Sequence, residues 1–330
     1  MSDRYLWDGS GDPDPEVQRL ERLLGRFRYQ DRPAQAVIPI RPARPTWLRP
    51  ALAIAAVLLL AVAGTWITAR QPRATWRVTQ LEGAPQVGAG RLRGAGRLAV
   101  GEVLETDSRS RATISVGEVG QVEVQPNTRV RLLTTRSKEH RLGLDRGLIH
   151  AFIWAPARAF FVETPSATAV DLGCTYTIEV DASGAALLRV TGGWVALEYT
   201  GRESLTPTGA QCPTRPGFGP GTPYYEDAPE ALRSALLTID FSSPAPDDVT
   251  RALAAARPRD AFTLWHVLAR VPSPHRERVY DRLAGLVVPP AGVTREGILA
   301  GDKNMLDAWW DQLGLEDASW FRLWRGPALK

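Results

Sequence analysis

Residues 51–69 read ALAIAAVLLLAVAGTWITA, a run without a charged side chain between Arg49 and Arg70. At a rise of about 1.5 Å per residue, roughly twenty helical residues cross the ~30 Å hydrocarbon core of a bilayer. Trp47 and Trp66 fall near its two ends, where indole rings prefer to lie at a membrane interface. A buried helix of a soluble domain rarely stays apolar on every face over this length. The stretch therefore predicts one transmembrane helix with unequal parts of the chain on its two sides.

A cleaved signal peptide is the main alternative for this apolar stretch. Its apolar region would be shorter and would begin close to the N-terminus, whereas fifty residues precede this one. We therefore interpret it as an uncleaved anchor. Four arginines stand in the twenty residues before the stretch and three in the twenty after it, so the positive-inside rule does not decide its orientation.

Residues 1–30 predict a small head with one amphipathic helix, from Pro15 to Arg28. Asp14 is a good N-cap, and proline suits the first helical position. Thirty residues cannot bury an apolar stripe by themselves, so the stripe needs a partner protein, a second copy or the membrane surface. Acidic residues in and before the helix argue against close contact with anionic lipid. We therefore expect a partner's groove to receive the apolar residues of the stripe, which are Val17, Leu20, Leu24 and Phe27.

The segments after the head change in composition. Residues 31–50 are rich in proline and predict an extended linker to the anchor. Residues 75–226 show short runs of alternating apolar and polar residues, separated by glycine or proline, which is an all-β pattern. The last part of this region, from residue 201, is a loop rich in glycine and proline. Residues 227–330 have helical periodicity and predict an all-α region.

Two copies of GAGRL, Gly88–Leu92 and Gly94–Leu98, lie in the β region. The second copy continues to Ala99 and fits GxGxxA, a dinucleotide-binding fingerprint. That fingerprint requires a buried strand before it and a helix after it, and the surrounding sequence is all-β. We interpret the repeat as a glycine-rich hairpin region, and we expect no cofactor.

Several short motifs follow one another in order between about residues 100 and 200. Together they resemble the FecR domain, whose pattern combines a Ser-Arg-Ala run, Pro-Asn-Thr, a strand with a glycine, and a Thr-Pro…Leu-Gly-Thr segment. One departure is Cys174, which stands where the family usually has threonine. The matching residues are Ser110, Arg111, Ala112, Pro126, Asn127, Thr128, Gly147, Thr164, Pro165, Leu172 and Gly173.

This resemblance implies a membrane-anchored α+β multidomain protein of the bacterial inner membrane. FecR proteins are single-pass regulators with the N-terminus in the cytoplasm and the C-terminus in the periplasm. By resemblance, the head would bind a sigma factor as an anti-sigma factor does, and the β domain, a β-helix or roll or a sandwich, would sense the periplasm. The head is shorter than in the iron-uptake regulators and lacks the His/Cys zinc motif of many anti-sigma factors. The C-terminal part also differs from the subdomain that follows in transport regulators.

A periplasmic β domain would carry both cysteines, Cys174 and Cys212, in an oxidising compartment where disulfides persist. The first would begin a core strand and the second would lie in the proline-rich loop. We therefore predict a Cys174–Cys212 disulfide.

The remaining chemistry classes lack support in the sequence. There is no CxxC pair or histidine spacing for a metal, and no nucleophile elbow, P-loop or zincin motif, so we expect no metal and no enzyme. The formal net charge of +4 is small and the basic residues are spread out, which disfavours direct nucleic-acid binding. The alternative to a regulator is a non-signalling periplasmic scaffold, or a module that binds a glycan or protein. The tryptophans of the helical region would be core or an exposed binding patch.

Overall fold

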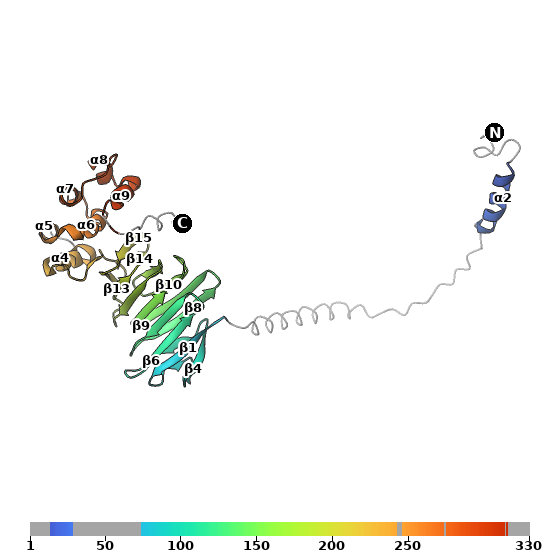
Figure 1. The fold of residues 1–330 in the computed structure, drawn as a ribbon, viewed down its shortest axis with the longest axis horizontal. Coiled ribbons are helices and arrows are strands. Elements are labelled where there is room, and N and C mark those ends of the chain that lie inside the picture. The colour runs from blue at the N-terminus through green and yellow to red at the C-terminus, as the bar shows by residue number, and fades with distance from the viewer. Residues whose placement is uncertain (1–13, 29–73, 243–245, 274, 314, 316–330) are drawn as a thin grey trace, which may run out of the picture. The chain divides into compact units, whose positions relative to one another are not determined.

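The structure is a computed structural model that describes residues 14–28, 74–242, 246–273, 275–313 and 315 (Figure 1). The chain divides into two compact units, Met1–Gln71 and Pro72–Lys330. The predicted linker 31–50 and the predicted transmembrane helix 51–69 lie outside the described residues. In the part that is described, no helix combines the length and the apolar character that a membrane crossing requires.

The first unit contains the predicted amphipathic helix. It consists of α2 (Pro15–Leu24) and the 3-10 turn η1 (Gly25–Phe27). Asp14 caps it as expected, because its side chain accepts a hydrogen bond from the backbone N–H of Glu16 at 2.8 Å. The α-helical part is shorter than predicted and ends at Leu24. Glycine has a low helix propensity, which explains why the helix tightens into a 3-10 turn at Gly25.

The β region forms two sheets that have one strand in common, β9 (Glu139–Ile153). In the first sheet, antiparallel neighbours follow in the order β4 (Ala95–Ala99), β1 (Thr75–Glu82), β6 (Arg111–Val116), β7 (Gly120–Val124), β9, β12 (Thr175–Val180), β13 (Ala186–Gly192) and β16 (Ala210–Arg215). Two short strands, β17 (Gly219–Pro220) and β18 (Tyr224–Tyr225), pair with β16.

The second sheet runs through the first half of β9. Its order is β3 (Gly90–Arg91), β2 (Gln86–Val87), β5 (Val103–Glu105), β8 (Arg129–Arg136), β9, β10 (Phe160–Glu163), β11 (Thr168–Asp171), β14 (Trp194–Tyr199) and β15 (Arg202–Pro207). The β9–β10 pair is parallel and its other pairs are antiparallel. The GAGRL repeat supplies β3 and β4, so its interpretation as a hairpin region without a βαβ unit is confirmed.

Strand β9 passes from one sheet to the other at Gly147. Arg146 pairs with β8 in the second sheet, and Gly147 pairs with β12 in the first. Gly147 has a φ of +92°, which glycine adopts without the penalty that a Cβ would bring. The two sheets enclose one core, to which alternate residues such as Ile114, Leu142 and Ile178 contribute fully buried side chains.

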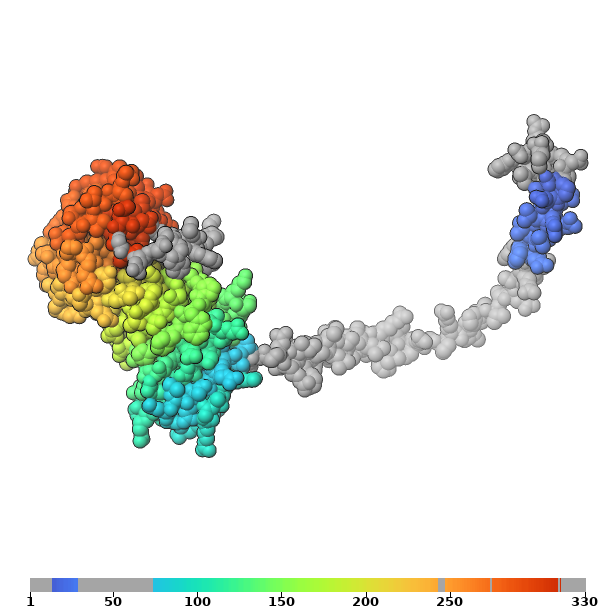
Figure 2. Space-filling view, viewed as in Figure 1, coloured from blue at the N-terminus to red at the C-terminus, as the bar shows by residue number. Residues whose placement is uncertain are grey.

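The helical region follows β18 and gathers beside β13–β15 (Figures 1 and 2). Its elements are α4 (Glu230–Phe241), α5 (Pro246–Ala255), η2 (Pro258–Asp260), α6 (Ala261–Leu268), α7 (His275–Leu286), α8 (Arg295–Ala300) and α9 (Lys303–Trp310). They enclose a second apolar core. Trp309 and Trp310 are buried, which confirms the core interpretation for these two tryptophans.

Helix α6 docks on the edge strand β15. The Nε2 atom of His266 accepts a hydrogen bond from the backbone N–H of Leu205 at 3.1 Å, and its Nδ1 atom lies 2.9 Å from the carbonyl oxygen of Phe262. Arg270, two residues after the end of α6, forms a buried ion pair with Asp240 of α4 at 2.9 Å. The hydrogen bond from Leu205 to His266 therefore occupies one backbone N–H on the edge of β15, which would otherwise be open for pairing with another strand.

Candidate functional site

The apolar residues predicted to bind a partner lie on one face of the first unit. Leu20, Leu24 and Phe27 are 56%, 60% and 78% exposed, and Val17 is half-buried. Leu23, which was absent from the predicted set, is also 53% exposed. Leu23 follows Leu20 by three residues, and this helical spacing indicates that it lies on the same apolar face. Within the first unit, the described residues are only those of α2, η1 and their two flanking residues, and none of them covers this face.

The first group of family-motif residues builds the turns around the sheet crossing. Ser110 is buried; its hydroxyl donates to Oδ1 of Asp107 at 2.8 Å and accepts from the N–H of Ala84 at 2.9 Å. Thr128 is also buried, and its Oγ1 accepts from the N–H of Leu148 at 2.9 Å, one residue after the crossing at Gly147. These residues therefore have structural roles.

The other members of this group are divided between surface and core. Arg111 forms ion pairs with Glu123 and, at 3.3 Å, with Glu82. Ala112 is fully buried in the core. Asn127 follows Pro126 in the turn before β8 and has a φ of +56°, a region that asparagine tolerates better than most residues.

The second group of motif residues forms two turns near β11. Thr164 and the exposed Pro165 belong to the turn before it, where Oγ1 of Thr164 accepts from the N–H of Ala167 at 3.0 Å. Leu172 is buried after β11 in an apolar cluster that includes Trp310. Gly173 has a φ of +85°, and its N–H donates to Oδ1 of Asp171.

The predicted Cys174–Cys212 disulfide is wrong: both cysteines are free and buried. Ile178 pairs with Leu188, which pairs with Cys212, so β13 separates the two cysteine-bearing segments. Cys174 also lies four residues before Ile178. Two strand spacings of about 5 Å and four rises of about 3.3 Å place the cysteines well beyond the ~7 Å limit between bridged Cα atoms.

Each thiol instead has its own contact. The Cys174 thiol donates to Oδ2 of Asp171 at 2.8 Å, and the Cys212 thiol donates to the carbonyl oxygen of Gly221 at 3.1 Å. Burial raises the pKa of Cys212 to about 12 and that of Asp171 to about 7. Burial also raises the pKa of Cys174. These thiols are therefore unreactive core groups.

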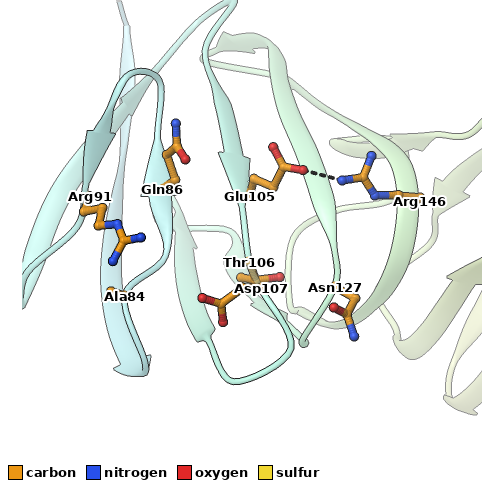
Figure 3. A pocket seen from close by; sticks show the side chains of 8 residues that line it. All are labelled: Ala84, Gln86, Arg91, Glu105, Thr106, Asp107, Asn127 and Arg146. Atoms are coloured by element: carbon orange, nitrogen blue, oxygen red, sulfur yellow. Dashed lines mark hydrogen bonds and ion pairs between the residues drawn. The ribbon is translucent and has the colours of Figure 1, made fainter.

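A polar pocket of about 360 Å³ lies beside the first group of motif residues (Figure 3). Hairpin β2–β3 forms one wall, β5 and the loop after it form the floor, and the β8 turn and β9 form the other wall. A second depression of about 420 Å³ adjoins it and has Gln86 and Glu105 in common with it. The first pocket is lined by Ala84, Gln86, Arg91, Glu105, Thr106, Asp107, Asn127 and Arg146.

Two of the four charged side chains that line the pocket, Glu105 and Arg146, form an ion pair with each other. Glu105 forms ion pairs with Arg146 and, at 3.1 Å, with Arg129. Asp107 is held as a carboxylate, because hydrogen bonds from the N–H of Arg109 and the hydroxyl of Ser110 lower its pKa. Sequence reasoning missed this pocket, apart from Asn127, because it is assembled from four separate segments.

Metal binding has no structural basis in the described residues. They contain no group of three His, Cys, Asp or Glu side chains that could hold an ion.

Residues 102–196 match the family described as FecR protein, in agreement with the resemblance of residues 100–200. No curated protein matches the chain. Among solved structures, two crystal structures of a candidate anti-sigma factor from Parabacteroides distasonis match, at 15% and 16% identity and a TM-score of 0.34. Each match covers 41% of this chain and 64% of the solved chain, so this protein spans less than two thirds of those structures.

Proposed function

We propose that this protein is a FecR-like, single-pass regulator of envelope signalling in the bacterial inner membrane. Residues 1–49 lie in the cytoplasm and bind a sigma factor through α2, residues 51–69 cross the membrane, and the β and helical regions sense the periplasm. The family match over residues 102–196 supports the regulator class.

The exposed apolar face of α2 is the observation that carries the sigma-binding part. Leu20 and Leu24 are one helical turn apart and both more than half exposed. Spacing of i, i+3, i+4 and i+7 is how a helix fills a partner's groove. Exposed leucine and phenylalanine on a helix of ten residues leave apolar area in water that a partner would cover.

A second candidate function is a scaffold or binding module in the periplasm. Phe152, at the end of β9, and Trp154 are 44% and 63% exposed on the β region. Exposed aromatic side chains occur at protein- and glycan-binding surfaces. In this alternative α2 would have no part in transcription.

Replacing Leu20 and Leu24 by aspartate separates the two functions. The charged side chains would remove two apolar anchors from the groove, and binding-site anchors of this kind contribute about 2 kcal/mol or more each. We expect the transcripts controlled by the partner sigma factor to rise more than about tenfold. RNA sequencing of a strain that carries the variant at normal protein level would measure this.

The matched control is the double variant Gln18→Asp/Arg22→Gln. It has the same i, i+4 spacing on the opposite face of α2 and changes the net charge by the same amount. Transcription should remain at the wild-type level in the control. Unchanged transcription in Leu20→Asp/Leu24→Asp would instead favour the scaffold function.

A further inference from the structure

The polar pocket contains three side chains whose hydrogen-bonding capacity the protein does not use. Within the described residues, Arg91 makes no hydrogen bond or ion pair. Oδ1 of Asp107 accepts two hydrogen bonds, whereas its Oδ2 accepts none from the same set of residues. The side-chain amide of Asn127 is likewise without a partner among them. These groups come from three different segments and line one cavity (Figure 3).

Arg91 and Asp107 carry opposite charges and belong to different segments of the pocket lining. Arg91 belongs to the β2–β3 hairpin, and Asp107 to the loop after β5; in Figure 3 both side chains extend into the space between those segments. They form no ion pair with each other, so a gap separates them. Glu105 forms ion pairs with Arg129 and Arg146, and Arg129 pairs in addition with Asp145, which holds the remaining wall in place. Among the described residues, the lining therefore keeps one cation, Arg91, and one anion, Asp107, outside any ion pair, and both are exposed to solvent.

A guanidinium fork matches the two oxygens of a carboxylate, and a carboxylate oxygen accepts from an ammonium group. We propose that this pocket binds a short zwitterionic peptide, with its terminal carboxylate on Arg91 and its ammonium group on Asp107. The cavity of about 360 Å³ falls within the range of small-ligand sites, roughly 300–1,000 Å³.

Asn127 lies on the side of Asp107 away from Arg91 (Figure 3), so Asn127 serves as a further control. Its φ of +56° shapes the turn before β8. Glycine adopts positive φ without strain, so Asn127→Gly keeps the turn and removes only the amide. Asp107→Asn likewise keeps Oδ1 as an acceptor for Arg109 and Ser110 and removes the charge.

The probe is the dipeptide alanyl-alanine at about 10 mM, a concentration that detects millimolar binding. Saturation-transfer difference NMR with the full chain in nanodiscs would report contact through the methyl groups of the peptide. We expect a signal that falls about tenfold in Arg91→Gln and Asp107→Asn and stays at the wild-type level in Asn127→Gly. N-acetyl-alanyl-alanine and alanyl-alanine amide, which each lack one charge, should bind about tenfold more weakly.

Arg93→Gln is the matched control, because Arg93 is an equally exposed arginine near the same hairpin but outside the pocket. Its signal should equal that of the wild type, and empty nanodiscs should give none. No signal with alanyl-alanine, equal signals from the capped peptides, or equal effects of Arg91→Gln and Arg93→Gln would overturn the proposal. Peptide binding at this pocket does not rest on the proposed function, and the binding assay does not involve α2, so either proposal can fail alone.

Discussion

At the scale of single residues, Gly147 is the position on which the β fold depends most. An added Cβ would lie 2.3 Å from Oγ1 of Thr128 and 2.5 Å from its Cα, so backbone atoms would have to move. The clash falls where β9 passes between the sheets. The motif residues Thr128 and Gly147 therefore require each other.

We predict that Gly147→Ala destabilises the protein by at least ~3 kcal/mol, because strain at positive φ and a backbone clash add up. Gly101→Ala is the control: Gly101 has a similar φ of +89°, and nothing lies within 4 Å of the added Cβ. It should cost only about 1–2 kcal/mol. Urea unfolding of the full chain in detergent would give both values. Equal losses would show that packing against Thr128 has no effect.

The residue scale also shows what the sequence could reveal. The order of Ser110, Thr128, Gly147 and Gly173 along the chain predicted the family domain, because turns and close approaches depend on local residue types. The disulfide prediction failed because it needed the distance between two strands, which depends on the pairing order β12–β13–β16. The pocket was missed for the same reason.

At the scale of elements, helix α6 and strand β15 are joined by a histidine that remains neutral. Burial, together with the nearby charge of Arg270, lowers the pKa of His266 to about 3. In the unfolded chain the pKa is near 6.5, so below that pH the unfolded state binds a proton that the folded state excludes. Stability is therefore lost as the pH falls from 6.5 towards 3.

We predict that His266→Gln, which retains a hydrogen-bond acceptor near Leu205, loses this acid sensitivity. The difference in unfolding free energy between wild type and variant should change by up to ~1.4 kcal/mol per pH unit below pH 6. Burial of Asp171 acts in the opposite direction, since its raised pKa of about 7 makes the fold less stable as the pH rises from about 4 to 7. That contribution is the same in both proteins and cancels. Tryptophan fluorescence in urea at pH 4.5, 5.5 and 7 would measure the difference, and parallel curves would contradict the prediction.

Element types were easier to predict than their connections. Alternation in residues 112–116 predicted β6, and the apolar period near residue 232 predicted α4, since both signals are local. The transfer of β9 from one sheet to the other and the cover that α6 gives β15 are long-range arrangements. Both arrangements depend on which elements come together in the folded chain, and no short stretch of sequence contains that information.

At the scale of the whole molecule, the proposed mechanism requires α2 and the β region to lie on opposite sides of a membrane. Composition alone predicted the anchor at residues 51–69, and the described residues contain no other segment of that character. The orientation rests on the FecR match over residues 102–196. The two ends of the chain lie on opposite sides of a membrane only if the chain crosses it an odd number of times, and the sequence predicts one crossing.

Reporters fused after Lys330 and inserted after Arg32 in the full chain, which keeps residues 51–69, test this arrangement most directly. Alkaline phosphatase folds to an active enzyme in the periplasm. Green fluorescent protein that is exported unfolded through the general secretory pathway does not fluoresce in the periplasm. We predict active phosphatase and dark fluorescent protein after Lys330, and the opposite pair after Arg32. Active phosphatase after Arg32 with inactive phosphatase after Lys330, or cytoplasmic activity at both positions, would contradict the account.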